Sequence, residues 1–384
     1  MNTQWMQFVE QVKQLYGKEF IPLHEPTFND KEIEYVTNCV KTGWVSSVGA
    51  YVTKFEEELA KFIGVKRAVA VVNGTAALHI ALKLAGVEAD DEVLMPSLTF
   101  IATANAVSYC RAIPHFIDVH EETLGVDPFK LENYLQQVAE LRNGELFNKQ
   151  TNRRIRALVP MHTFGHAAHI DELVDLAEKY HLVLVEDAAE SLGTYYKGKH
   201  TGSFGKINAM SFNGNKIITT GGGGAILTDD ETLADYAKHL TTTAKVPHQW
   251  EYAHDEVGYN YRMPNINAAL GCAQLEKLEQ FLVQKEALAN KYEELVTNID
   301  GVTLFTQPTN SDSNYWLQTL KLEDSFNRDE VLSFLNEQGV MSRPIWQPMH
   351  ELELYKHCPT MDLAVTNDLK KRIVNIASTP INVK

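Results

Sequence analysis

The sequence lacks paired cysteines, basic clusters and long apolar runs, and each absence excludes a class of protein. The chain has four cysteines, Cys39, Cys110, Cys272 and Cys358. None of them forms a CxxC pair of the kind found in zinc-binding or redox motifs. The 50 Asp and Glu residues outnumber the 35 Lys and Arg residues, and the net charge of −15 argues against a nucleic-acid partner. No apolar run approaches the roughly 20 residues that span a bilayer, so we predict a cytoplasmic protein without a membrane segment.

From residue 30 onward, helical patterns alternate with short apolar strands. Asp30 is expected to cap the first of these helices. Helices are predicted at 31–42, 52–62, 75–85, 101–109 and 170–180, and strands at 68–72, 93–95, 113–117, 156–160 and 182–185. Apolar strands of this length, joined by helices, predict an α/β fold with a mostly parallel sheet that helices cover on both faces.

The pattern changes after residue 185. Two strands at 209–212 and 225–228 follow each other across a glycine-rich turn, and a long helix is expected at 265–298. Beyond it we expect two strands and helices at 329–337 and 362–376. We therefore predict three regions, namely an amphipathic helical extension at 1–20, a large domain at 21–262, and a connecting helix with a small α+β domain at 263–384. No flexible linker separates them, so the domains should pack tightly.

The first candidate site is a strand that runs through Asn73, Gly74 and Thr75 directly into a helix. Free N–H groups and the positive end of the helix dipole make such a turn suitable for an anion. An ordinary turn with Thr75 as a cap explains the same residues.

The second candidate is the carboxylate pair Glu186 and Asp187, at the end of the apolar strand 182–185. Open α/β sheets bind ligands at this edge. Because strand alternation places the two side chains on opposite faces, we expect only one to face the crevice. A solvated strand end remains the alternative.

The third candidate is Lys216, which lies between two apolar strands and is followed by four glycines at 221–224. Glycines at this density suggest a backbone that approaches another group closely. A lysine held there would be partly desolvated, which favours use as a nucleophile. A purely structural glycine turn is the alternative.

Three histidines, His162, His166 and His169, have the i, i+4, i+7 spacing of a helical metal site. Gly165 interrupts the pattern, and the helix is expected to start only near residue 170. We therefore predict loop residues, one or two of which line the crevice, and no bound metal.

Taken together, these segments resemble the DegT/StrS-type nucleotide-sugar aminotransferases, which are pyridoxal-phosphate (PLP) enzymes of fold type I. The resemblance runs from Ile21 onward and rests on the order and spacing of the segments 73–78, 96–100, 186–190, 211–216 and 258–262. It implies a mostly parallel, seven-stranded type of sheet between helices in the large domain. It also implies a homodimer whose subunits share active sites.

The resemblance also implies roles for particular residues. Lys216 would bind the cofactor covalently and move the substrate proton, and Asp187 would pair with the pyridine nitrogen. The remaining cofactor-binding residues would be Gly74, Thr75 and Ser211 at the phosphate, Phe100 stacked on the ring, Glu190 near the phenolic oxygen, and Asn260 from the neighbouring subunit. Many members carry Gln at the position of Glu190, and a carboxylate there must be protonated or paired.

The sequences of segments 20–26, 44–49 and 211–223 resemble those of one branch of this family. That branch aminates C4 of UDP-linked 4-keto-6-deoxy-N-acetylhexosamines, of bacillosamine or legionaminic acid type, with glutamate as the amino donor. Candidate substrate-binding residues are Trp44, Ser46, His162, Arg262, Arg343 and His350. Loop arginines such as Arg262 and Arg343 serve equally often in solvent salt bridges.

Three other functions are compatible with a chain of this fold. A dehydratase of the same fold would carry histidine in place of Lys216, and a non-catalytic regulatory protein would not need Lys216, Asp187 and Ser211 together. An aminotransferase acting at C3, or on a dTDP- or GDP-linked keto-sugar, is the third.

Overall fold

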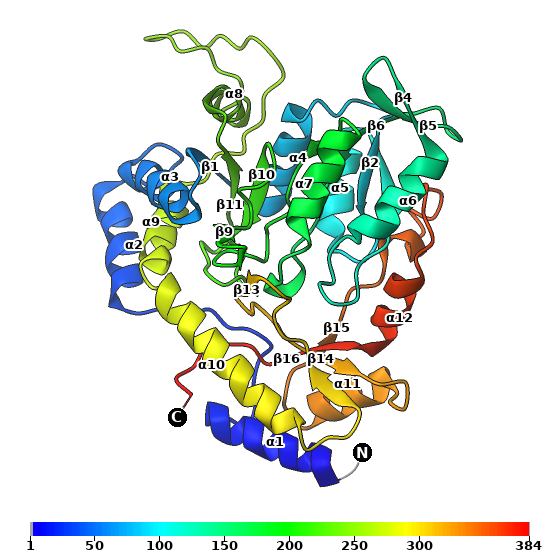
Figure 1. The fold of residues 1–384 in the computed structure, drawn as a ribbon. Coiled ribbons are helices and arrows are strands. Elements are labelled where there is room, and N and C mark those ends of the chain that lie inside the picture. The colour runs from blue at the N-terminus through cyan, green and yellow to red at the C-terminus, as the bar shows by residue number, and fades with distance from the viewer. Residues whose placement is uncertain (1–2, 384) are drawn as a thin grey trace.

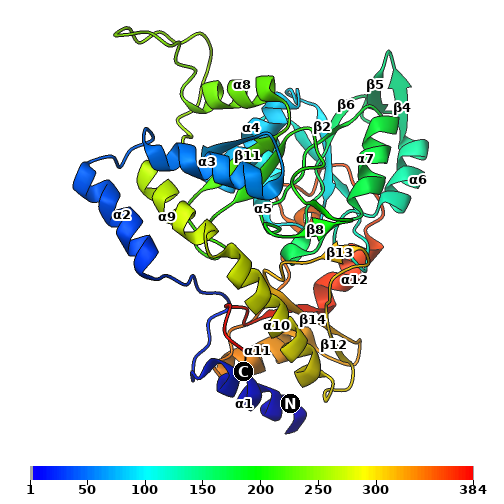
Figure 2. The same ribbon diagram turned by 60° about the vertical axis from the view of Figure 1, so that its left-hand side comes forward.

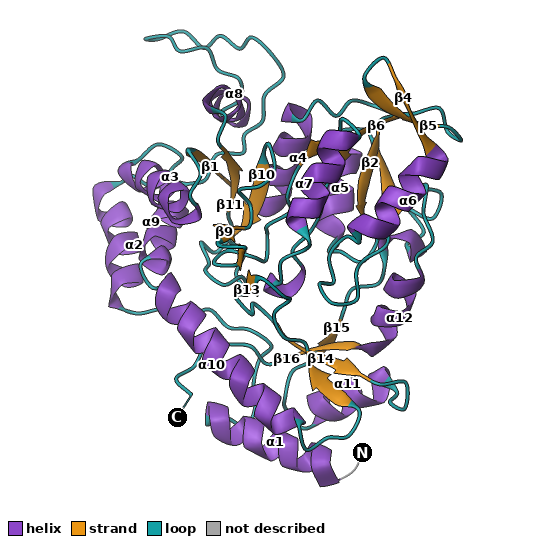
Figure 3. Cartoon of the chain, in the orientation of Figure 1, coloured by secondary structure: helices purple, strands orange, loops and turns teal. Residues whose placement is uncertain are grey.

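The computed structural model describes residues 3–383 and shows an α/β body joined by a long helix to a smaller lobe (Figure 1). In Figure 3 the strands of the body lie between helices. Within residues 3–383, no helix combines the length and the apolar character that crossing a membrane requires.

The body is built on seven strands in two hydrogen-bonded groups. One group has the order β1 (Arg67–Val71), β11 (Gly224–Thr228), β10 (Asn208–Ser211), with β11 antiparallel to both neighbours. The other has β7 (Val183–Leu184), β6 (Arg154–Leu158), β2 (Glu92–Pro96) and β3 (Ile113–Ile117), all parallel.

Residues just after β7 join the two groups into one sheet. The Asp187 N–H donates to the Pro160 carbonyl at 2.9 Å, and the Ala209 N–H donates to the Glu186 carbonyl at 3.0 Å. Both bridges at Asp187 are parallel. The mostly parallel, seven-stranded sheet expected from the sequence is therefore confirmed, and β11 is its antiparallel member.

Helices cover both faces of this sheet. The side chains of β1 show the two faces directly, because Ala68 and Ala70 enter one apolar core while Val69 and Val71 enter another. The first core includes helices α3 (Ala50–Ile63) and α9 (Asn265–Leu275), and α2 (Asp30–Thr42) packs on α9; the second includes α4 (Gly74–Leu84), α5 (Ile101–Tyr109) and α8 (Glu231–Thr241). Helices α6 (Pro128–Val138) and α7 (Ile170–Lys179) close a third core beside β6.

The smaller lobe surrounds an antiparallel sheet in the order β12 (Val302–Leu304), β14 (Gln318–Leu322), β16 (Ile373–Ile376), β15 (Arg343–Pro344). Its helices are α10 (Leu278–Val296), α11 (Arg328–Glu337) and α12 (Ala364–Arg372). Helix α1 (Thr3–Tyr16) lies beside α10 (Figures 1 and 2) and buries Trp5 and Phe8 in the same core as Tyr292. The proposed boundaries at 20 and 262 stay predictions.

Several elements differ from the sequence prediction. The expected helix 265–298 is two helices, because the chain turns at Glu276 and Lys277, where neither Gly nor Pro marks the break. The expected helix 362–376 ends at Arg372, since the β-branched residues that follow pair with β14 as β16. The cap of α2 is Asn29 rather than Asp30, in a capping box with Glu32.

Other elements had no counterpart in the prediction. These are α6, α8, the hairpin β4 (Ala139–Arg142) and β5 (Glu145–Asn148), the short strands β8 (Tyr195–Tyr196), β9 (Lys199–His200) and β13 (Ser311–Asp312), and the 3₁₀ turns η1 (Thr163–Gly165) and η2 (Met349–Glu351).

Candidate active site

A cavity of about 350 Å³ opens at the carboxyl ends of β7 and β10, where the two strand groups meet. Residues from β-strand ends, helix starts and the smaller lobe line it: Asn73, Gly74, Thr75, Leu78, Phe100, Ala102, Met161, Asp187, Ala189, Glu190, Ser211, Asn213, Asn215, Lys216, Trp316 and Trp346. The structure thus gathers seven of the eight residues expected to bind the cofactor around one cavity.

The start of α4 forms an anion cradle on one side of this cavity. Asn73 caps the helix by accepting the Ala76 N–H at 2.8 Å. Within residues 3–383 no hydrogen bond uses the N–H of Gly74 or Thr75 or the hydroxyl of Ser211. A Cβ on Gly74 would lie 2.8 Å from that of Ser211, so only glycine permits this approach. Unused donors at a helix start suit a phosphate group.

Asp187 lies on another side of the cavity and is almost fully buried. Its Oδ2 accepts the Thr103 hydroxyl at 2.6 Å, and its Oδ1 accepts the Ala189 N–H at 3.2 Å. Burial raises the pKa of Asp187, and the Thr103 hydrogen bond opposes that rise. A buried carboxylate without a directly bonded cation suits a positively charged ring nitrogen.

Glu186, its neighbour in sequence, points away from the cavity as strand alternation predicts. It accepts N–H groups of Gly202 at 2.8 Å and of Gly205 at 2.8 Å, and it contacts His162. Only Asp187 of the pair therefore faces the site.

Lys216 reaches the cavity beside a second buried carboxylate. Its Nζ donates to Glu190 Oε1 at 3.0 Å, and the Phe164 N–H donates to Glu190 Oε2 at 2.9 Å. Burial raises the pKa of Glu190, and the charge of Lys216 opposes that rise. Nζ also lies 3.8 Å from the ring centroid of Trp316. Glu190 is thus paired, as a carboxylate at this position requires.

Phe100 stands immediately before α5 and contributes an exposed ring to the cavity. Its ring centroid lies 6.4 Å from that of Trp346, which belongs to the smaller lobe. A flat cofactor ring beside Phe100 would find aromatic surface there.

Three important residues were missed by sequence reasoning, namely Thr103, Trp316 and Trp346. Thr103 is one residue in an ordinary helical pattern, so no local signal singles it out. The two tryptophans lie 100 or more positions after Lys216 and reach the cavity only through the packing of the smaller lobe. From sequence alone, an aromatic residue in a strand or loop is usually assigned to the hydrophobic core.

Two expected substrate-binding residues do not line the cavity. His162 is fully buried, with Nε2 at 2.9 Å from Glu186 Oε2 and Nδ1 accepting the Ala168 N–H. Arg262 donates from Nη1 to Glu56 Oε1 at 2.9 Å, and both side chains are buried. Both residues thus have buried polar partners and neither lines the cavity within the described chain, so their assignment as substrate-binding residues stays a prediction.

The other expected residues lie outside the cavity on the surface of the chain. Trp44 is exposed and borders a separate hollow with Val48, and Ser46 is exposed nearby. Arg343 is exposed on β15, and His350 Nδ1 lies 2.7 Å from the Ser97 hydroxyl. Asn260 is exposed in a segment bridged to Thr242. Within residues 3–383, none of these side chains lines the site.

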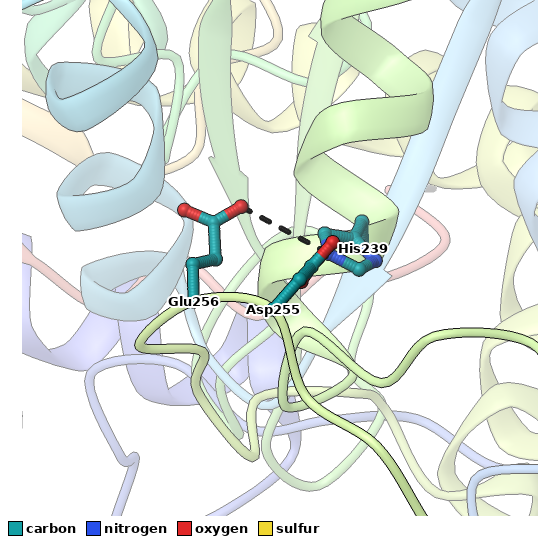
Figure 4. Close-up of side chains that lie close together, drawn as sticks. All are labelled: His239, Asp255 and Glu256. Atoms are coloured by element: carbon teal, nitrogen blue, oxygen red, sulfur yellow. Dashed lines mark hydrogen bonds and ion pairs between the residues drawn. The ribbon is translucent and has the colours of Figure 1, made fainter.

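One group of possible metal ligands occurs in the described part of the chain, away from the cavity. His239 Nε2 lies 2.7 Å from Asp255 Oδ1, with Glu256 close by (Figure 4). Both carboxylates are solvent-accessible, and the contact with His239 is an ordinary surface hydrogen bond.

Comparison with known proteins gives this cavity a context. The profile of the DegT/DnrJ/EryC1/StrS aminotransferase family matches residues 26–381. The chain is 38% identical over 364 residues to EpsN of Bacillus subtilis, whose name describes a pyridoxal phosphate-dependent aminotransferase, with 93% of this chain and 90% of EpsN covered. It is 38% identical over 348 residues to GDP-perosamine synthase of Caulobacter vibrioides, covering 90% and 89%.

The fold agrees with these sequence relatives. A crystal structure of a DegT DnrJ EryC1 StrS aminotransferase from Brucella abortus superimposes with a TM-score of 0.82, at 28% identity and over 91% of each chain. The unused donors at α4, the buried Asp187 and the lysine at the cavity fit PLP by their chemistry. The chain therefore belongs to the DegT/DnrJ/EryC1/StrS aminotransferase family and is a PLP-dependent nucleotide-sugar aminotransferase.

Proposed function

We propose that the enzyme transfers the amino group of glutamate to C4 of a UDP-linked 4-keto-6-deoxy-N-acetylhexosamine. The observation that carries the transfer is the position of Lys216, which shares one cavity with Asp187 and the unused donors of α4. The choice of sugar rests on the sequences of segments 20–26, 44–49 and 211–223, which resemble those of the C4-aminating branch.

A GDP-linked keto-sugar is the second candidate. It is supported by relatives named GDP-perosamine synthase, which match 34–38% of aligned positions in three organisms. The two candidates share the amino transfer and differ in the nucleotide and the sugar, so a substrate comparison separates them directly.

We assign the cofactor contacts to residues that already surround the cavity. The N–H groups of Gly74 and Thr75 and the hydroxyl of Ser211 would hold the phosphate, Phe100 would stack on the ring, and Asp187 would hold the ring nitrogen in its protonated form. When bound, PLP supplies an electron sink for the carbon that loses its proton.

Lys216 would carry the proton between the substrate carbon and the bound cofactor. It is suited to this step because Nζ reaches the cavity and is in contact with both Glu190 and Trp316. Glu190 would stabilise the protonated form of the amine, and Asp187 would keep its own charge aimed at the ring nitrogen.

The C4 keto group is a chemically reasonable acceptor. A 4-keto group is the product of the common 4,6-dehydration of nucleotide sugars, and its carbonyl carbon is open to attack by an amine. The sugar can enter the cavity while the diphosphate stays near its mouth.

The cavity supplies few positive charges for such a substrate. Lys216 is the one cationic side chain among the described residues that line it. A diphosphate and the carboxylates of glutamate need further cations or N–H donors. This supports a homodimer in which the neighbouring subunit completes the site, with Asn260 as its contribution.

The test is a substrate panel of UDP-, GDP- and dTDP-linked 4-keto-6-deoxy sugars, each with glutamate, followed by NMR of the product. We expect the UDP-linked N-acetylhexosamine to be preferred and to carry nitrogen at C4. A clear preference for a GDP- or dTDP-linked sugar, or nitrogen at C3, would contradict the assignment. Lys216→Ala, which removes the amine, is the matched inactive control.

A further inference from the structure

Trp316 contacts the lysine segment at two separate points. The Nζ of Lys216 lies 3.8 Å from the centroid of the Trp316 ring. The Nε1–H of the same ring donates to the carbonyl of Asn215 at 2.6 Å. One side chain thus touches both the end of the lysine and the backbone immediately before it.

Trp316 is itself firmly held. Its backbone N–H donates to Asn314 Oδ1 at 2.8 Å, and its carbonyl accepts from Lys285 Nζ at 2.8 Å. Lys285 is fully buried on α10, and it also donates to the Ser378 carbonyl. Because a buried lysine donates to two carbonyls of the smaller lobe, the backbone at Trp316 is closely fixed.

The same anchor also reaches Glu190, the carboxylate partner of Lys216. Asn314 donates from Nδ2 to the Glu190 carbonyl at 2.9 Å, while its Oδ1 holds Trp316. Asn314 is 1% exposed, so water does not compete with these bonds. The backbones of Glu190 and Trp316, whose side chains contact Lys216, are therefore tied to one side chain.

A lysine needs such flanking groups because its stem is flexible. Its side chain has many rotamers, and an amine that would bind and release the cofactor in each turnover would have to return to the same atom. A cation lies favourably over a tryptophan face, and an ammonium pairs with a carboxylate.

We propose that Trp316 is a positioning residue for Lys216, through its ring face at Nζ and its Nε1–H bond to Asn215. This inference rests on the proposed role of Lys216. It gives the smaller lobe a direct part in amino transfer, although the lysine belongs to the larger body.

Trp346 provides a matched control. It also comes from the smaller lobe and lines the same cavity, but its ring neighbours are Phe164 at 4.9 Å and Phe100 at 6.4 Å between centroids. Removing either tryptophan opens the cavity by a similar volume, so effects specific to Trp316 report its contacts with Lys216 and Asn215.

Three variants separate the contacts of the ring. Trp316→Phe keeps an aromatic face but loses the Nε1–H bond, Trp316→Leu loses both, and Trp346→Leu is the control. Two rates are measured on the full chain. One is covalent attachment of added PLP at Lys216, trapped with borohydride; the other is single-turnover amino transfer from glutamate deuterated at its α carbon.

We expect Trp316→Leu to slow both rates about 10- to 100-fold, as for a misplaced reacting group, and to enlarge the deuterium isotope effect, with KM for both substrates retained. Trp316→Phe should fall between it and the wild type. Trp346→Leu should slow attachment less than Trp316→Leu, because its ring neighbours are Phe164 and Phe100 rather than Lys216, and it should act mainly on KM.

Unchanged attachment and isotope effects in both Trp316 variants would overturn the inference, as would an equal loss of attachment rate in Trp346→Leu. Should Trp316→Leu fail to fold, Trp316→Phe alone decides, because the loss of the Asn215 bond must then slow attachment. Peptide mapping of the wild type gives a separate answer, since label on another lysine refutes the role of Lys216 before Trp316 is tested.

Discussion

The hydroxyl of Thr103 lies 2.6 Å from Oδ2 of Asp187, and both side chains are buried at the edge of the cavity. Thr103 stands three positions after Phe100, on the first turn of α5. One helix start therefore positions the exposed aromatic ring and orients the carboxylate. Because the hydroxyl donates to Asp187, it favours the ionised form of that carboxylate.

The Thr103 hydrogen bond leads to the first prediction. Thr103→Val keeps the shape of the side chain and removes the donor, so Asp187 loses a bond of about 1.5–3 kcal/mol. We expect kcat to fall roughly tenfold or more, while Thr103→Ser stays near the wild type. Steady-state kinetics of the two variants provide the check. Equal losses in Val and Ser would point to packing instead of the hydrogen bond.

A second prediction concerns pH and Glu190. Burial raises the pKa of Glu190 above its usual value of 4.5 in the folded chain. Between these two values the folded state holds a proton that the unfolded state releases, so the stability from this group is present at low pH and is lost as pH rises. Glu190→Gln removes this dependence.

The melting temperature of the cofactor-free variant, measured against the wild type, should therefore rise progressively as pH increases above 4.5. The two proteins should converge at lower pH, where Glu190 is protonated. A difference that does not vary with pH would show that the ion pair with Lys216 fully offsets the cost of burying the carboxylate, and would contradict the prediction.

Much of the site could be predicted from sequence because its residues lie in short motifs at strand and helix ends. Gly74, Asp187 and Lys216 each belong to a segment whose composition shows a constraint, such as two carboxylates after an apolar strand or four glycines in a row. Strand ends of a parallel sheet meet at one edge, but it was the resemblance to the aminotransferase family that joined these motifs into one cofactor site.

The remaining features depend on contacts between distant parts of the chain. Trp316 contacts Lys216 because α10 connects the smaller lobe to the body beside the cavity. Arg262 does not reach the cavity because its guanidinium pairs with Glu56 on α3. Residues 373–376 form a strand because β14 is available as a partner. Local composition does not reveal such contacts between distant segments. The helical periodicity therefore predicts a helix that continues through the residues of β16.

The ion pair of Arg262 and Glu56 leads to a third prediction. Arg262→Met leaves Glu56 with the Ala70 N–H and the more exposed Lys238, so the variant should lose about 1–3 kcal/mol of unfolding free energy. KM for the sugar nucleotide should be unchanged. Urea unfolding and kinetics measure both quantities.

Lys238→Met is the matched control, since it removes the outer partner of the same carboxylate. Its side chain is 45% exposed, and its loss should cost less than about 1 kcal/mol. A large rise in KM with unchanged stability in Arg262→Met would instead restore Arg262 as a substrate-binding residue.

The last prediction tests the shared active site through Asn260. This side chain is exposed, and its backbone is bridged to Thr242 at the base of the segment that extends beyond α8 in Figure 1. Lys216→Ala and Asn260→Ala should each be inactive alone. If Asn260 serves the neighbouring subunit, a mixed dimer contains one site with neither change.

Random exchange of equal amounts should then restore about a quarter of wild-type activity, because half of the dimers are mixed and each has one intact site. The control mixes Lys216→Ala with Asp187→Asn. Both of these residues line the cavity of the same chain, so every site stays defective and no activity should return. Mass spectrometry establishes that subunits have exchanged. Absence of recovery in the first mixture after exchange would place Asn260 outside the neighbouring site, while recovery confined to that mixture follows only from a site built by two subunits.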